Sequence, residues 1–231
     1  MPQPGTIDQI LDAFLREQRS RLADRTYRNY EDVIRLLRHS LDAYGYSSLS
    51  KADAKRWQQA FDAGDEEAFC HLFGPEEIPS HLGEFLGYFM VRKVMAGQEL
   101  LKAAGTVTGK LVRWLEKEGH IEPEAAEIAA DRARDGARDL PAADRLGSLL
   151  QDVASHAPDI DVDDVDDEDW IEEQLMISEI EPGRIWFEGD IGPIEVPKRA
   201  SDLAKPGWMV FVVAARRKGR WHLLEVGSVY P

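Results

Sequence analysis

The sequence has few of the features that most often reveal a function. Its 231 residues include one cysteine, Cys70, so the chain forms no internal disulfide, and a lone cysteine is most often a small buried apolar residue. No apolar run approaches the length of about 18 residues that spans a bilayer. Residues 1–5 lack the charged-then-apolar pattern of a signal peptide. These absences predict a cytoplasmic protein with no membrane partner.

The motifs of common enzyme and metal classes are also missing. The chain has no Walker loop, no dinucleotide-binding glycine fingerprint, no Cys/His zinc spacing and no Gly-x-Ser-x-Gly elbow. Asp159, Asp161 and Asp163 have the spacing of the first ligands of a calcium loop. However, Asp164 replaces the glycine of that loop and Trp170 replaces its glutamate. We therefore expect no catalysis, no metal, no cofactor and no small-molecule substrate.

Acidic residues are in excess, and they are unevenly distributed. The net charge is −15. Residues 1–157 carry 20 Lys and Arg against 26 Asp and Glu, residues 158–181 carry none against 12, and residues 182–231 carry 8 against 5. Because like charges repel along a chain, the central segment is expected to be extended. Residues 158–174 are therefore predicted to be an acidic linker between two domains.

Residues 1–121 are predicted to form a helical bundle, because apolar side chains recur there at steps of three and four. The first two helices are expected within residues 6–46. In a third helix, Trp57 and Phe61 are expected to be buried. The spacing of Gly83 and Gly87 in the strongest predicted helix indicates a close helix–helix approach.

Two further segments complete the predicted fold. Residues 122–157 are rich in alanine and charge and predict a helical arm or hairpin, in which Pro141 starts a new helix. Residues 175–231 change to a period of two and predict five short strands: 175–180, 184–188, 191–196, 208–214 and 220–229. We expect these strands to close into a small SH3-like or OB-like β-barrel, because closure removes exposed edges. The predicted fold class is α+β in separate domains.

One stretch of the N-terminal half carries a family resemblance. The residues concerned are Phe14-Leu15, Leu22, Arg25-Thr26, Asn29-Tyr30, Leu36-Leu37, Tyr44-Gly45-Tyr46, Leu49-Ser50, Ala54 and Trp57. This run resembles the N-terminal core-binding (SAM-like) domain of tyrosine recombinases, the phage integrases. The resemblance implies a small helical bundle that clamps DNA, while the family places its chemistry in a separate domain. That catalytic domain is absent here, because the chain has no His-x-x-Arg motif and nothing near Tyr230 would activate it as a nucleophile.

The resemblance implies that cations of the second and fourth helices contact phosphates and base edges. The candidates are Arg25, Arg28, Arg35, Arg38, Arg92 and Lys93. Glu31, Asp32 and Asp42 lie among the first four, so the alternative is a solvated face of mixed charge.

A second basic cluster is predicted at the tip of a hairpin in the barrel. It consists of Arg216, Arg217, Lys218 and Arg220, with aromatic residues nearby. Small barrels bind nucleic acids by combining cationic loops with aromatic side chains, although basic hairpin tips are also commonly inert. The acidic linker is expected either to lie against this tip and compete with phosphate, or to serve as a solubilising spacer.

The sequence therefore predicts a non-catalytic, DNA-associated or regulatory protein with DNA as its partner. The alternative is a protein–protein adaptor that binds no nucleic acid. A degenerate remnant of a mobile element is a third possibility.

Overall fold

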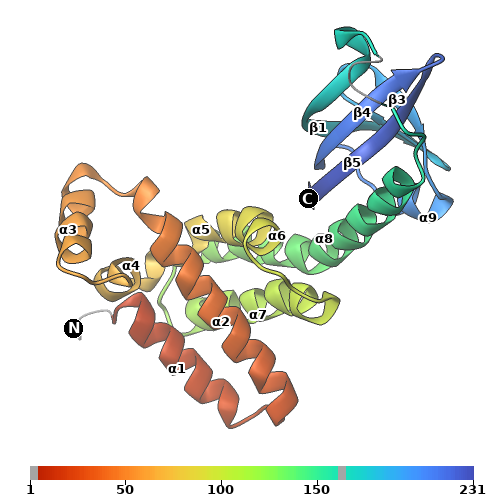
Figure 1. Cartoon of the computed structure of the whole chain (residues 1–231). Helices are drawn as coiled ribbons and strands as arrows, with labels where there is room; N and C mark the ends of the chain where they lie inside the picture. The colour runs from red at the N-terminus through yellow and green to blue at the C-terminus, as the bar shows by residue number, and fades with distance from the viewer. Residues whose placement is uncertain (1–4, 161–164) are drawn as a thin grey trace. The chain divides into compact units, whose positions relative to one another are not determined.

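Figure 1 shows the computed structural model of the chain, in which residues 5–160 and 165–231 are described. The chain divides into two compact units, Met1–Arg138 and Asp139–Pro231. The boundary falls inside the segment predicted as an arm. By sequence, the first unit carries 19 Lys and Arg against 23 Asp and Glu, and the second carries 9 against 20.

The first unit is helical, as predicted. Its helices are α1 (Ile7–Arg19), α2 (Asp24–Tyr44), η1 (Gly45–Ser48), α3 (Lys51–Asp62), α4 (Ala68–Leu72), η2 (Pro75–Glu77), α5 (Ile78–Glu84), η3 (Phe85–Phe89), α6 (Met90–Arg92), α7 (Gln98–Lys117) and the first part of α8 (Pro123–Ser155). A capping box formed by Thr6 and Gln9 starts α1. In Figure 1, α1 and α2 run side by side, and their apolar faces supply much of the core of this unit.

The strongest predicted helix is interrupted. Residues 85–89 form a π-helical turn between α5 and α6. The close helix–helix approach is not at Gly83 or Gly87, because a Cβ added to Gly87 would meet no atom within 4 Å. It occurs at Gly105 of α7, where an added Cβ would lie 2.6 Å from the carbonyl oxygen of Ala133 in α8. The glycine that allows two helices to pack closely is therefore in a different helix from the one predicted.

Helix α3 differs from its prediction in burial. None of its residues is buried. Phe61 and Tyr46 each retain 45% of their surface, and Trp57 is stacked between them, with ring centroids 4.5 Å from Tyr46 and 5.2 Å from Phe61. The expected buried stripe is therefore a half-exposed aromatic stack, because neighbouring helices cover α3 on one side only.

Helix α8 is continuous through Pro141, so no new helix starts at that residue. In the second unit, Ala142, Ala143, Leu146 and Leu150 of α8 are buried in the same core as the sheet. Burial of this face stabilises a helix that the local proline signal would end, since packing commonly overrides local propensity.

The five strands lie where the sequence predicts them. They are β1 (Trp170–Glu181), β2 (Arg184–Phe187), β3 (Ile191–Glu195), β4 (Met209–Arg217) and β5 (Arg220–Tyr230). They form one antiparallel sheet in the order β3-β2-β1-β4-β5. Two short helices accompany them, η5 (Asp167–Asp169) and α9 (Lys198–Ser201).

The sheet is not closed into a barrel, contrary to the prediction. No ladder joins its edge strands β3 and β5, although they approach each other. Strand β3 has only five residues, and its Pro193 has no backbone N–H to donate to a ladder. Residues 158–174, predicted to be a linker between two domains, fall within the second compact unit, and residues 170–174 belong to β1 and pair with β4. Residues 161–164 of the predicted linker, including Asp161, Asp163 and Asp164, lie outside the described residues.

Within the described ranges, no helix combines the length and apolar character needed to cross a bilayer.

Candidate functional site

Three of the six predicted cations of the helical unit are paired with carboxylates. Arg25 lies 3.0 Å from Glu99, and Arg35 lies 3.1 Å from Asp32. Arg38 lies between two acids of α1, with its Nε 3.0 Å from Asp8 and an Nη 2.5 Å from Asp12. The Arg38 side chain retains only 24% of its surface. Arg38 therefore ties α2 to α1.

The other three predicted cations of this unit have no ion-pair partner among the described residues. They are Arg28, Arg92 and Lys93. Arg28 lines a small depression that also contains Asp24 and Glu31, so carboxylates share its surroundings. Arg92 and Lys93 lie at the end of α6. The structure therefore leaves individual free cations in the helical unit and pairs the remainder.

The hairpin between β4 and β5 has the predicted basic tip. Arg217 and Arg220 face each other across the ladder, and Lys218 and Gly219 make the turn, with φ angles of 53° and 76°. Positive φ at both positions of a two-residue turn matches the right-handed twist of the strands. The turn therefore places four cationic side chains within five residues of chain.

The acidic segment contacts this tip through its two described ends. Arg216 pairs with the carboxylate of Asp169 at 2.5 Å and also lies over the Trp221 ring, 5.7 Å from its centroid. Arg217 donates a hydrogen bond to the backbone carbonyl of Asp159 at 3.2 Å. This carbonyl is neutral, and no carboxylate of the described residues pairs with Arg217. One of the four cations is therefore neutralised by a carboxylate among the described residues, and three are not.

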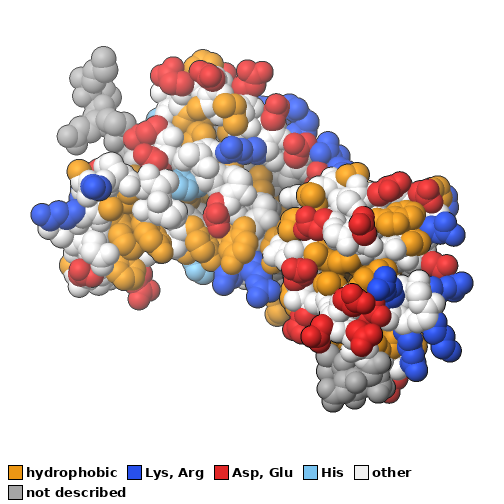
Figure 2. Space-filling model, turned by 90° about the horizontal axis from the view of Figure 1, so that it is seen from above, with side chains coloured by type: hydrophobic (Ala, Val, Ile, Leu, Met, Phe, Trp, Pro, Cys, Tyr) orange, Lys and Arg blue, Asp and Glu red, His pale blue; other side chains and the backbone are white. Residues whose placement is uncertain are grey.

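The side chains of Lys218 and Arg220 form no ion pair or hydrogen bond with any described residue. Both are exposed. The surrounding unit is strongly acidic, and Figure 2 shows acidic side chains gathered on one area of the sheet unit, with Lys and Arg on another. The hairpin tip is therefore a small basic site on an acidic unit.

A pocket of about 740 Å³ lies beside the hairpin, between the two unpaired strand edges and the end of α8. Its walls include Ile194 and Glu195 of β3, Trp221 and Leu223 of β5, and Val153 of α8. Ile194 and Leu223 are each 1% exposed, so they belong to the core beneath the pocket. The pocket exists because the sheet does not close.

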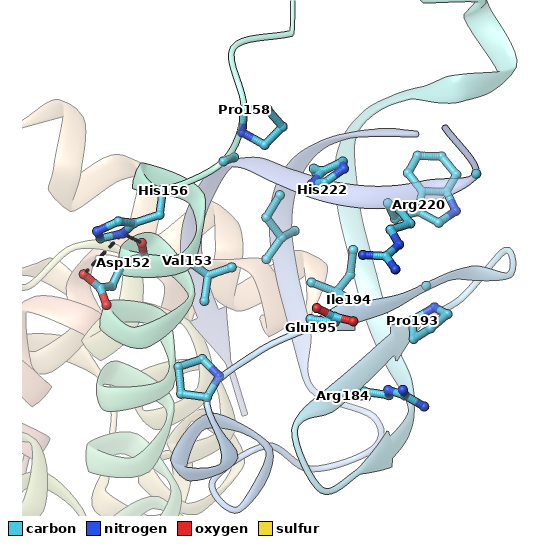
Figure 3. Close-up of a pocket in the computed structure, with 16 residues that line it drawn as sticks. Asp152, Val153, His156, Pro158, Arg184, Pro193, Ile194, Glu195, Arg220 and His222 are labelled. Carbon is cyan, nitrogen blue, oxygen red and sulfur yellow. Dashed lines mark hydrogen bonds and ion pairs between the residues drawn. The ribbon is translucent and has the colours of Figure 1, made fainter. Parts of the chain in front are cut away.

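The charged groups around the pocket differ in whether they already have a hydrogen-bond or ion-pair partner. In Figure 3, His156 and Asp152 are joined to each other, and the ring Nδ1 of His156 lies 2.7 Å from the backbone carbonyl of Asp152. The guanidinium of Arg220, by contrast, extends from β5 into the gap beside β3. Arg184 and His222 also line the pocket. Arg184 lies 3.9 Å from Glu181, so Arg220 is the arginine of this pocket that has no ion-pair partner among the described residues.

The single cysteine of the chain does not line this pocket. Cys70 is buried in the helical unit, where its backbone N–H donates to Asp42 at 2.9 Å. Burial and the nearby Asp42 carboxylate raise the pKa of the Cys70 thiol far above its ordinary value, so it remains protonated. This confirms the expectation of a buried cysteine. No group of three His, Cys, Asp or Glu side chains in the described part of the chain is placed to hold a metal ion.

The sequence missed two features. The pocket depends on strands that fail to pair, and only the proline in β3 pointed to an interrupted edge. Trp57 and Phe61, which stack with Tyr46 and are partly exposed, were predicted to be buried. The spacing of Trp57 and Phe61 along α3 places them on one face of the helix, but it does not show whether another element covers that face.

In comparisons with known proteins, no family model, curated protein or solved structure matches the chain. The resemblance to the recombinase core-binding domain stays a prediction from sequence.

Proposed function

We propose that the protein is a non-catalytic DNA-associated protein whose contact with DNA is made by the β4–β5 hairpin. The observation that carries this proposal is the charge state of the tip. Arg217, Lys218 and Arg220 have no carboxylate partner among the described residues, although the unit that presents them contains 20 acidic residues. A phosphate is attracted to such a group without displacing a bound carboxylate.

The tip also explains how an acidic protein binds a polyanion. Charges further apart than about 8–10 Å are largely screened at physiological salt. A turn that projects three adjacent cations therefore attracts phosphate locally despite the net charge of −15. Because only a few phosphates are contacted, we expect modest affinity and a modest dependence on salt.

Binding to fluorescently labelled DNA, followed by anisotropy, tests this proposal. The variant R217A/K218A/R220A removes the three uncompensated charges. The matched control R19A/R25A/R35A also removes three positive charges, each of which is paired with a carboxylate in the helical unit. We expect the hairpin variant to weaken binding at least tenfold and the control to change it less than about twofold. Equal losses would refute a role for the hairpin.

A protein–protein adaptor is a second candidate function, favoured by the aromatic stack on α3. Tyr46 and Phe61 each leave 45% of their surface exposed, which is unusual for two neighbouring aromatic residues in a folded helical unit. An adaptor would bind its partner with little dependence on salt and would not respond to the hairpin variant.

A further inference from the structure

The cationic tip of the hairpin can bind phosphates, and the pocket beside it has room for a further part of a ligand. We propose that it receives one unstacked nucleotide, so that the preferred ligand is single-stranded nucleic acid. This inference rests on the proposed function, because the hairpin must first bind the phosphates of the strand.

The size and the walls of the pocket fit a nucleotide. Its volume of about 740 Å³ lies within the range of about 300–1,000 Å³ that is typical of sites for small organic ligands. Val153 and Pro193, neither of which is buried, provide apolar surface on which a base can lie. Trp221 also lines the pocket, and its ring is half-buried and held by Arg216. Stacking of a base on an aromatic side chain stabilises single-strand complexes without requiring a particular base.

Two polar side chains of the pocket, Arg220 and Glu195, are placed to bind the phosphate and the base of a nucleotide. Arg220 belongs to both the hairpin tip and the pocket, so one guanidinium can bind the phosphate next to an inserted base. Glu195 lies on the opposite edge and has no ion-pair partner among the described residues, which leaves it able to accept hydrogen bonds from a base amino group. Among the described strands, β3 and β5 each leave one edge unpaired, and residues of both strands line the pocket.

A duplex does not satisfy this geometry. Its bases are paired and stacked, so none enters a pocket without the cost of unstacking, which is a few kcal/mol. A duplex also places two phosphate backbones near a unit with 20 acidic and 9 basic residues. A single strand threads one backbone past the tip and inserts a base freely.

The test compares a single-stranded oligothymidylate with a duplex of the same length, by anisotropy on the full chain. We expect the wild type to bind the single strand at least tenfold more tightly. The variant A157W places an indole in the mouth of the pocket without changing the charge. We expect it to lose about tenfold in affinity for the single strand and to retain its affinity for the duplex. The control S148W adds the same ring to an exposed position of α8 that does not line the pocket.

The outcomes separate this inference from the function on which it rests. Equal affinity of the wild type for the two nucleic acids overturns the single-strand inference and leaves the hairpin proposal standing, and this comparison needs no variant. Unchanged single-strand binding by a folded A157W variant overturns the role of the pocket. Binding to neither nucleic acid overturns the proposed function and this inference together. A loss of single-strand binding in A157W but not in S148W supports the pocket.

Discussion

The two units of the chain differ in how many of their predicted cations are paired with a carboxylate among the described residues: three of six in the helical unit and one of four at the hairpin tip. In the helical unit, half of the predicted contacts are ion-paired, and Arg38 is largely covered between Asp8 and Asp12. In the sheet unit, which is far more acidic, Arg217, Lys218 and Arg220 at the tip of a hairpin have no carboxylate partner among the described residues. Net charge is therefore a poor guide to where a polyanion binds. What matters is whether each cation already has a carboxylate beside it.

Reversing charge in each unit is the strongest way to test this contrast. The variant K218E/R220E turns the tip acidic, and we expect DNA affinity to fall about a hundredfold or more, because two attractive contacts become repulsive. The corresponding variant R28E/K93E changes the net charge equally, at two unpaired cations of the helical unit. We expect it to lower affinity less than about threefold. Anisotropy titrations at a single salt concentration measure the DNA affinity of both variants. A larger loss of affinity in R28E/K93E than in K218E/R220E would mean that the DNA site lies in the helical unit.

The role assigned to Arg38 predicts a change in stability without a change in binding. The variant R38A leaves Asp8 and Asp12 without their shared cation and removes a partly buried hydrogen bond to the Asp8 carbonyl. We expect the helical unit to lose about 2 kcal/mol of unfolding free energy. Denaturant unfolding followed by circular dichroism measures this loss. If R38A remained as stable as the wild type but bound DNA poorly, Arg38 would be a contact residue as the sequence predicted.

A smaller effect is expected from the acidic segment. Deleting residues 159–173 would not test whether the segment competes with DNA, because residues 170–173 are the start of β1. The variant D169N removes the carboxylate that pairs with Arg216 and keeps the shape of the side chain. We expect DNA binding to tighten about twofold to fivefold, since a surface ion pair is worth about 1 kcal/mol or less. The matched control D202N frees Lys198 elsewhere in the same unit and should leave affinity unchanged. If D169N had no effect, the competition would be excluded.

The positions of the helices and strands were largely predictable from sequence, whereas the contacts between them were not. Alternating apolar residues located all five strands, because strand period is a local property. Closure of the sheet depends on whether β3 pairs with β5, which lie far apart in the sequence, so the open edge and its pocket could not be foreseen. Similarly, Pro141 locally predicts a helix start, but apolar residues of α8 that pack in the sheet core keep the helix continuous.

The candidate site was predicted in part for the same reason. The basic tip follows from a Lys-Gly turn between two strands, which is a local signal. The pairing of Arg25 with Glu99 joins residues of α2 and α7, and no spacing rule connects them. Trp57 and Phe61 were assigned to the core because helical periodicity shows that two residues share a face but not whether another element covers it.

The salt dependence of DNA binding tests the central claim most directly. Between about 50 and 200 mM salt, each neutralised phosphate contributes about −0.7 to −0.9 to the slope of log K against log salt concentration. With three uncompensated cations at the tip, we predict a slope of roughly −2 to −3 for the wild type, and a slope near zero for R217A/K218A/R220A. Identical slopes for the two proteins would contradict the claim that the hairpin carries the contact with DNA.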